Sequence, residues 1–180
     1  MKFIHHAELR EGRWRNGMGV SWDIATDADA GGDDFGWRLA IARIDSDVPF
    51  SHYRQVDRIF TLIEGQGFDL DFADGRALAV DYPFVPHPYP GDVPTFCRLR
   101  DGPCRALNLF LKRGRWEAAV DIVSSNAGIT HPGPILAFVL KGTAAMNGVN
   151  LETGDTAVTD ERISIVASEA LVYAARLTAI

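Results

Sequence analysis

The sequence is poor in cysteine and has no long apolar segment. Its 180 residues include two cysteines, Cys97 and Cys104, which flank the segment RLRDGP. A disulfide across the hairpin expected there is one alternative, but two free thiols are the usual state in a reducing compartment. No apolar segment approaches the ~20 residues that span a bilayer as a helix, and the N-terminus, MKFIHHAELREG, lacks the apolar core of a signal peptide. We therefore expect a cytoplasmic protein that does not act at a membrane.

Basic residues are also fewer than acidic ones. Lysine and arginine total 18 against 24 aspartate and glutamate residues, which gives a net charge of −6. Proteins that bind nucleic acids usually present a basic face to the phosphate backbone, so a nucleic-acid partner is not expected. Otherwise the composition is that of a globular protein, and the length suits one domain or two small repeats that share a core.

Helical patterns are scarce, and strand patterns fill most of the chain. Residues 37–44, WRLAIARI, show the alternation typical of a strand. Residues 57–72 predict two strands joined by a glycine-containing turn, and residues 95–114 predict a second pair. Residues 113–126, RGRWEAAVDIVSSN, are the one candidate for a helix, and they fit a strand equally well.

The distribution of prolines and turn residues supports an all-β fold. Residues 81–94 hold five of the nine prolines, and proline lacks the N–H that a central strand needs. We therefore predict an ordered surface loop there. Residues 135–177 predict about six short strands separated by turn residues. Short strands at this spacing are typical of a sandwich or a barrel.

Two segments resemble the sequence pattern of cupins. DRIFTLIEGQGFDLDF, residues 57–72, is similar to the strand–turn–strand in which cupins place an acidic metal ligand seven residues before a glycine. LETGDTAV resembles the Gly-Asp turn that opens the later cupin strands, and LKGTAAMNGVNLETGD extends the likeness into the second half. The resemblance implies an all-β bicupin, a double-stranded β-helix. Its two cupin-like halves, residues 1–114 and 115–180, would pack as one compact unit.

A more specific resemblance covers residues 14–114. The segments WRNGMGVSWDIA, FGWRLAIARI, PFSHYRQVDRIFTLIEGQG, YPGDVPTFCRLRDGP and ALNLFLKRG follow one another in this order, and together they resemble the HutD/Ves family of small bacterial bicupin proteins. Two departures are Met18, where the family usually has a glycine, and the proline-rich residues 83–90. The resemblance implies binding of a small catabolic intermediate such as formylated glutamate in histidine utilisation, or a stress-associated role in the other branch. It implies no established catalytic activity.

The cupin resemblance raises the question of a metal. A metal-bearing cupin uses an H-x-H pair, a carboxylate and a later histidine, which are donors that suit divalent ions. Here the position seven residues before Gly65 is Arg58, whose guanidinium cannot ligate a cation. Because His52 is the one histidine near the expected pair, a site built from His52, Asp57 and His87 is the remaining alternative to ordinary surface histidines. We expect neither a metal nor another cofactor.

An arginine at that position favours a negatively charged ligand instead. By alternation, Arg58 shares a strand face with Phe60, and Arg38 shares a face with the small residues Ala40 and Ala42. A buried guanidinium needs an internal acid or a bound anion, and its planar fork is well suited to a carboxylate. We therefore expect both arginines to face a cavity that admits a small anion.

A purely structural role for the two arginines is the alternative. Arg38 would then pair with Asp23, and Arg58 with Asp57. The two interpretations are compatible, because internal acids can orient the guanidinium groups towards a ligand. Asn108 lies between apolar neighbours in ALNLFL, so its amide needs partners that either a backbone group or a ligand would supply.

Residues 13–25, RWRNGMGVSWDIA, combine a turn signal with side chains that a turn does not need. The Asn-Gly pair at residues 16–17 predicts a tight turn with two positive φ angles. Trp14, Arg15 and Asn16 then form either the rim of a cavity or the end of an edge hairpin.

These observations favour a metal-free, cupin-like protein that binds a small carboxylate or amide metabolite and acts in histidine utilisation or its regulation. One alternative is an isomerase or hydrolase with His52 or Asp57 as its general base. A metal-dependent oxygenase is a third hypothesis, and a homodimer formed through strand edges is also open. The candidate ligand-binding residues are Trp14, Arg15, Asn16, Asp23, Arg38, His52, Asp57, Arg58 and Asn108.

Overall fold

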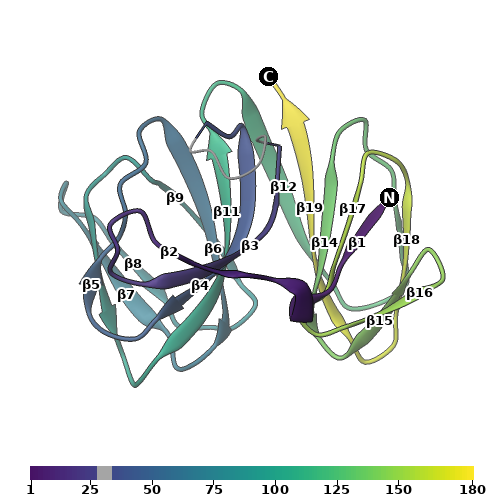
Figure 1. Cartoon of the computed structure of the whole chain (residues 1–180), viewed down its shortest axis with the longest axis horizontal. Helices are drawn as coiled ribbons and strands as arrows, with labels where there is room; N and C mark the ends of the chain where they lie inside the picture. Colours follow the sequence, from purple (N-terminus) through teal and green to yellow (C-terminus); the bar gives the residue numbers. More distant parts are fainter. Residues whose placement is uncertain (28–33) are drawn as a thin grey trace. The chain divides into compact units, whose positions relative to one another are not determined.

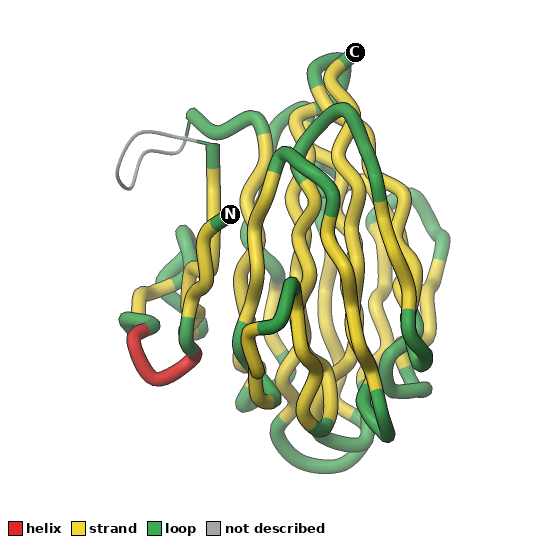
Figure 2. Tube along the Cα trace, turned by 90° about the vertical axis from the view of Figure 1, so that its right-hand side faces the viewer, coloured by secondary structure: helices red, strands yellow, loops and turns green. Residues whose placement is uncertain are grey.

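The computed structural model describes residues 1–27 and 34–180. Within these residues the regular structure is β-strand throughout, apart from one short 3-10 helix, η1 (His6–Glu8) (Figure 2). The prediction of an all-β fold is confirmed. None of the described segments forms a helix with the length and apolar character needed to cross a membrane.

The chain divides into two compact units. One contains residues 10–113, and the other contains residues 114–180 together with residues 1–9. The sequence placed residues 1–9 with the first half, whereas strand β1 (Lys2–Ile4) pairs with β17 (Thr156–Thr159) of the C-terminal half (Figure 1). This pairing joins segments more than 150 residues apart, which local sequence patterns do not reveal.

The unit of residues 10–113 consists of a six-stranded and a four-stranded antiparallel sheet. The larger sheet has the order β2 (Glu11–Arg13), β3 (Val20–Thr26), β4 (Trp37–Ile44), β11 (Cys104–Lys112), β6 (Val56–Glu64) and β9 (Pro86–Pro90). The smaller sheet has the order β5 (Val48–Pro49), β10 (Thr95–Leu99), β7 (Phe68–Phe72) and β8 (Ala77–Val80). Side chains from both sheets, among them Phe60, Leu62, Phe68 and Leu70, form one buried core.

The turn between β6 and β7 depends on its glycines. The predicted hairpin itself is wrong, because β6 belongs to the six-stranded sheet and β7 to the four-stranded sheet, so the turn connects two sheets. Gly65 and Gly67 both adopt positive φ, 101° and 93°. A Cβ atom at Gly67 would lie 2.4 Å from the carbonyl oxygen of Val80, so any other residue type here would force the backbone of β7 or β8 to shift. The missing side chain of Gly67 therefore lets the start of β7 lie against the end of β8, where Phe68 pairs with Val80.

The proline-rich segment is only partly a loop. Pro86–Pro90 form strand β9, which pairs with β6 at the edge of the six-stranded sheet, so the prediction of a loop throughout is wrong for these residues. Prolines alternate along β9, and an edge strand tolerates them because their missing N–H groups fall on the side that has no partner strand.

The second unit has a five-stranded and a four-stranded antiparallel sheet. The first has the order β1, β17, β14 (Ile135–Lys141), β19 (Leu171–Ala179) and β12 (Trp116–Val123), and the second has the order β13 (Ala127–Ile129), β18 (Ile163–Ala167), β15 (Thr143–Met146) and β16 (Val149–Glu152). Strand β12 lies within the segment that fitted a helix and a strand equally well, and it pairs with β19 along its whole length. Side chains such as Ile135, Met146 and Leu151 fill the interior of this unit.

Candidate functional site

The six-stranded sheet of residues 10–113 bears a small cavity on its inner face. The cavity leaves about 20 Å³ in which the centre of a water molecule can move. Its aromatic wall comprises Trp14, Phe50, Tyr53, Phe60 and Phe110, and its polar lining comprises Ser21, Arg38, Ser51, Arg58 and Asn108. The site therefore combines flat apolar surfaces with two cations and several neutral polar groups.

Strand register brings the two arginines to the same face. Arg38 on β4 lies opposite Phe110 on β11, and Phe110 lies opposite Arg58 on β6. Residues directly opposite one another on neighbouring strands project to the same side of a sheet. The next row of the same face contains Ala40 and Asn108, and the small alanine leaves room beside the long arginines. The predicted faces of Arg38 and Arg58 are thus confirmed.

Arg58 is buried without a carboxylate among the residues that the structure describes. It is 5% exposed, and its Nε donates a 3.4 Å hydrogen bond to Oδ1 of Asn108. Its guanidinium carbon lies 4.8 Å from the ring centres of both Phe60 and Phe110, and 5.4 Å from that of Tyr89. Burial lowers the pKa of Arg58, and the like charge of Arg38 acts in the same direction, yet an arginine keeps its proton in such surroundings.

Arg38 occupies the more solvent-exposed part of the cavity and does have an acidic partner. Its guanidinium carbon lies 5.2 Å from the ring centre of Phe110, and its Nε donates a 2.7 Å hydrogen bond to Oδ1 of Asp23. The Arg38 side chain is 18% exposed and that of Asp23 56%. Of the two structural ion pairs considered from the sequence, this one is present.

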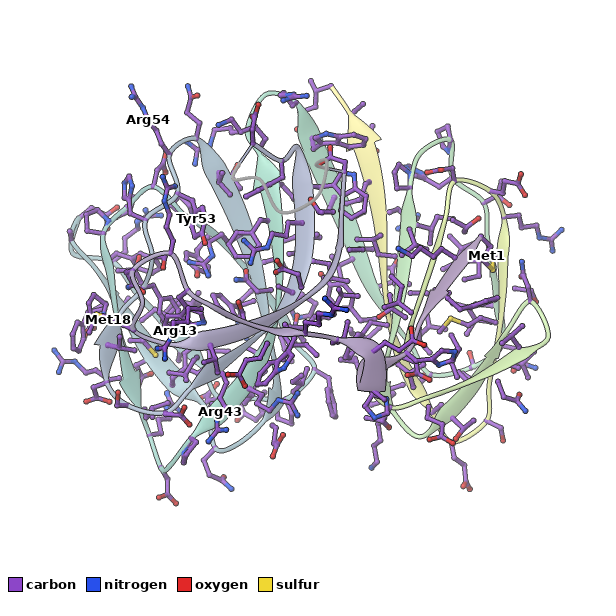
Figure 3. The ribbon with its side chains drawn as sticks, in the orientation of Figure 1. Met1, Arg13, Met18, Arg43, Tyr53 and Arg54 are labelled. Atoms are coloured by element: carbon purple, nitrogen blue, oxygen red, sulfur yellow. The ribbon has the colours of Figure 1, made fainter. Side chains whose placement is uncertain are left out.

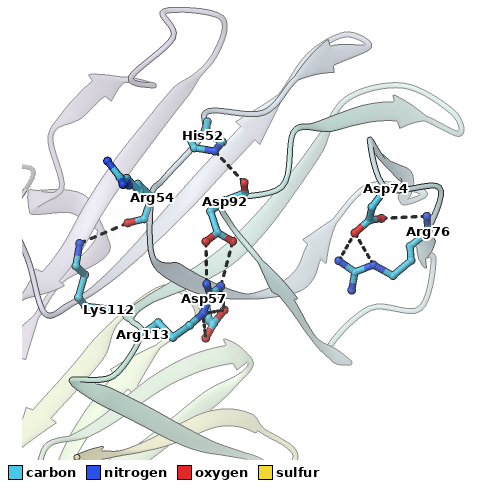
Figure 4. Close-up of polar contacts among 8 residues, drawn as sticks. All are labelled: His52, Arg54, Asp57, Asp74, Arg76, Asp92, Lys112 and Arg113. Carbon is cyan, nitrogen blue, oxygen red and sulfur yellow. Dashed lines mark hydrogen bonds and ion pairs between the residues drawn. The ribbon is translucent and has the colours of Figure 1, made fainter.

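The other ion pair is not formed, because Asp57 has a different partner. Its carboxylate accepts hydrogen bonds from Arg113, the shortest at 2.6 Å, and Arg113 also donates to the carboxylate of Asp92 (Figure 4). Arg58 projects to the inner face of β6, whereas its neighbour Asp57 projects to the opposite one, as alternation along a strand requires. Asp57 therefore leaves the charge of Arg58 uncompensated.

The neutral polar groups of the cavity are arranged as hydrogen-bond donors. The Ser51 hydroxyl accepts a 3.2 Å hydrogen bond from the backbone N–H of Asn16, so its own proton is available to a ligand. Asn108 uses its carbonyl oxygen on Arg58, which leaves its amide N–H groups as donors. Donors of this kind suit the oxygen atoms of a carboxylate or an amide.

The segment that precedes β3 forms one wall of the cavity. The Trp14 ring meets Phe50 edge-on, with 5.5 Å between the ring centres, and its Nε1 donates a 2.8 Å hydrogen bond to the Val20 carbonyl. Asn16 donates through Nδ2 to the carbonyl of Pro49 at 2.8 Å. Of the expected pair of positive φ angles only Gly17 has one, 72°, because the turn between β2 and β3 is longer than a two-residue hairpin.

Three of the expected site residues lie outside the cavity lining in different ways. Arg15 lies against the lining residue Tyr53, with its guanidinium carbon 5.8 Å from the Tyr53 ring centre. Asn16 and Asp23 each contact a lining residue, Ser51 and Arg38. Arg15, Asn16 and Asp23 therefore contact residues of the cavity wall but do not line the cavity themselves.

His52 and Asp57 also lie apart from the cavity. Ser51 and Tyr53 line it, and His52 between them turns outwards, where its Nε2 lies 2.9 Å from the Asp92 carbonyl oxygen (Figure 4). The same alternation places Tyr53 inside the unit and Arg54 at its surface (Figure 3). The hypothesis of an enzyme with His52 or Asp57 as general base would place that base outside the cavity.

The residues at the expected ligand positions do not fit a metal ion. Among residues 1–27 and 34–180, no group of three or more histidine, cysteine, aspartate or glutamate side chains is arranged to hold one. Arg58 occupies the position of the expected carboxylate, and His52 and Asp57 are engaged with Asp92 and Arg113. We derive no metal chemistry for this site.

Sequence reasoning missed much of the cavity lining. It did not select Ser21, Phe50, Ser51, Tyr53 or Phe110. The strand alternation that placed Arg58 inwards also marks Phe110, which lies two residues after Asn108. Ser51 and Tyr53 also alternate with exposed neighbours, but they belong to a loop and not to a strand, so no local pattern indicated that they lie beside the sheet.

The model of the HutD family matches residues 6–174 of this chain. The chain belongs to the HutD family. A protein of Pseudomonas putida named as an uncharacterized 21.2 kDa protein in the hutC 3′ region is 35% identical over 105 residues, which cover 58% of this chain and 55% of that protein. Protein Ves of Cronobacter sakazakii is 29% identical over 150 residues, which cover 82% of this chain and 80% of its own.

Solved structures agree with this membership and extend the likeness in fold. The structure of HutD from Pseudomonas fluorescens SBW25, described as a formate condition, matches this HutD-family chain with a TM-score of 0.88 at 26% identity, over 99% of this chain and 98% of that one. A cupin 2 conserved barrel domain protein from Leptotrichia buccalis matches with a TM-score of 0.59 at 12% identity, over 99% and 96% of the two chains. The fold is therefore cupin-like, as the sequence pattern predicted.

Proposed function

We propose that this HutD-family protein binds a small metabolite bearing a carboxylate or an amide, a compound like formylglutamate, and does so without a metal. The observation that carries the proposal is the buried guanidinium of Arg58, which borders the cavity and has no carboxylate partner among the described residues. A small carboxylate at this position would supply the missing negative charge.

The energetics of burial support an anionic ligand. A charge removed from water is costly unless it is paired, and Arg58 has one long hydrogen bond to a neutral amide together with contacts to aromatic rings. A carboxylate would add charge-assisted hydrogen bonds, which are roughly twice as strong as neutral ones. The donors of Ser51 and Asn108 would complete the contacts to its oxygens.

The size and walls of the cavity support a small planar group. With about 20 Å³ for the centre of a water molecule, the enclosed part admits a terminal carboxylate or formyl group, and the rest of the ligand would extend past Arg38. Phe60 and Phe110 give this group flat apolar surfaces on which to lie.

The names of relatives support a link to histidine utilisation. The Pseudomonas putida relative is named for its place beside hutC, and the Pseudomonas fluorescens relative is named HutD. We propose that this chain acts in the same context, by sensing or buffering an intermediate of histidine breakdown.

Calorimetry and thermal unfolding with formylglutamate, glutamate, urocanate and formate test this function. A ligand at ~100 times its Kd should raise the free energy of unfolding by about 2.7 kcal/mol. The variant Arg58→Gln should lose this effect, and the control Arg98→Gln, at an exposed arginine that pairs with Asp71, should keep it. The absence of any shift with all four compounds at millimolar concentration, in a folded sample, would contradict the proposal.

A further inference from the structure

The two cations of the cavity differ in their polar partners. Arg38 and Arg58 both lie against the ring of Phe110, at 5.2 and 4.8 Å from its centre. Among the described residues, Asp23 bonds to Arg38, and no carboxylate bonds to Arg58. The site therefore has one position for an anion that is open, at Arg58, and one that is already occupied, at Arg38.

The occupied position lies on the solvent side. Asp23 stands on β3 opposite Ala40, in the same row of the sheet as Asn108. Its side chain is 56% exposed, against 18% for Arg38, and a register shift in β3 follows directly after it. Ion pairs with so exposed a partner contribute little to stability, so a second carboxylate of comparable geometry can replace Asp23 on Arg38.

We propose that Asp23 is a specificity-determining residue that occupies Arg38 and competes there with the second acidic group of a ligand. This inference rests on the proposed function, because it assumes that a first carboxylate binds at Arg58. A ligand with one carboxylate leaves the Arg38–Asp23 pair intact. A ligand with two must displace Asp23, so in the wild type its second charge brings little gain in affinity.

The experiment measures how much a second carboxylate adds. Calorimetry at 0.15 M salt compares succinate, glutarate and adipate with butyrate, pentanoate and hexanoate, so that each dicarboxylate is matched by a monocarboxylate of equal chain length. The readout is the ratio of the two dissociation constants within each pair. In the variant Asp23→Asn, this ratio should shift in favour of the dicarboxylate by about tenfold at the best-fitting length, because Arg38 is then open to the ligand.

Two controls distinguish an effect that acts through the Asp23–Arg38 contact from an effect of the changed net charge. Asp45→Asn removes a carboxylate from the exposed Arg43–Asp45 pair on the same sheet and should leave the ratio unchanged, since charges beyond about 8 Å are largely screened at this salt. In an Arg38→Gln background, Asp23→Asn should no longer shift the ratio, because its effect acts through Arg38. Circular dichroism of each variant verifies that it is folded.

Each outcome supports or overturns the inference. If both ligand classes bind the wild type and Asp23→Asn leaves the ratio unchanged, or shifts it equally in the Arg38→Gln background, the role of Asp23 is wrong and the proposed function stands. If neither the wild type nor Asp23→Asn binds any of the six compounds or the four metabolites named above, the proposed function fails and this inference fails with it.

Discussion

Arg58 donates a 3.4 Å hydrogen bond to Oδ1 of Asn108, and the two residues lie on adjacent strands in the buried wall of the same cavity. The pair joins a permanent cation to a neutral amide, where a structural arginine would have a carboxylate. The cation is thus held in position without being neutralised, which is the arrangement that an anion-binding site needs before its ligand arrives.

Replacing the cation with an apolar side chain should separate stability from binding. We expect Arg58→Met to leave the unfolding free energy of the ligand-free protein equal or higher, because it removes a desolvated charge. Ligand at ~100 times its Kd should raise the unfolding free energy of the wild type by about 2.7 kcal/mol. This increase should be absent in Arg58→Met. Urea unfolding with and without ligand measures both quantities. A variant that is destabilised and still gains stability from ligand would argue against this role of Arg58.

Supplying the missing carboxylate from the protein should imitate the bound state. In Asn108→Asp the new carboxylate faces Arg58, so we expect a rise of about 1.5–3 kcal/mol in unfolding free energy at pH 7 and a loss of ligand binding. The stabilisation should be complete above the pKa of an unfolded aspartate, ~3.9, and should vanish as acid protonates the carboxylate. Urea unfolding at pH 7 and pH 3 measures it. The control Asn150→Asp, at an exposed residue of β16, should show no such gain.

A buried aspartate in the other unit should make stability depend on pH. Burial alone would raise the pKa of Asp155, but hydrogen bonds from the backbone and side chain of His6, from the Glu152 N–H and from His5 outweigh it and lower the pKa to about 2. Because this pKa lies below its unfolded value, the stabilisation is present above pH ~4 and is lost as the pH falls towards 2.

The variant Asp155→Asn tests that dependence. Its deficit in unfolding free energy relative to the wild type should be on the order of 2 kcal/mol at pH 7 and should shrink between pH 4 and pH 2. Denaturant titrations at these pH values measure the deficit. Glu152→Gln, at an exposed neighbour, should show no comparable trend, and a deficit for Asp155→Asn that stays constant with pH would contradict the explanation.

Two glycines with similar backbone angles should respond differently to alanine. Gly75, with a φ of 87°, has open space where a Cβ would lie, whereas a Cβ at Gly67, with a φ of 93°, would meet the Val80 carbonyl oxygen at 2.4 Å. Gly75→Ala should cost only the ~1–2 kcal/mol of a left-handed backbone. Gly67→Ala should cost clearly more, because the β7–β8 pairing must also shift. Thermal and urea unfolding compare the two, and equal losses would show that the close approach is unimportant.

The sequence by itself determined which faces the strand residues occupy. Alternation with a period of two is a local property, so the inward positions of Arg38 and Arg58 and the cupin-like succession of strands and glycine turns could be predicted without a structure. Residues 113–126 stayed undecided, because Trp116, Ala119, Val120 and Val123 recur at helical spacing while EAAVDIV fits a strand equally well. The pairing with β19 decides for a strand.

Only the tertiary structure decided which groups meet. Asp57 pairs with Arg113, 56 residues away, instead of its neighbour Arg58, and Ser51 and Tyr53 join the cavity from a loop. Residues 2–4 likewise pair with β17. These choices depend on the register between strands that are distant in sequence, which is set by the packing of the whole unit and which no local pattern encodes.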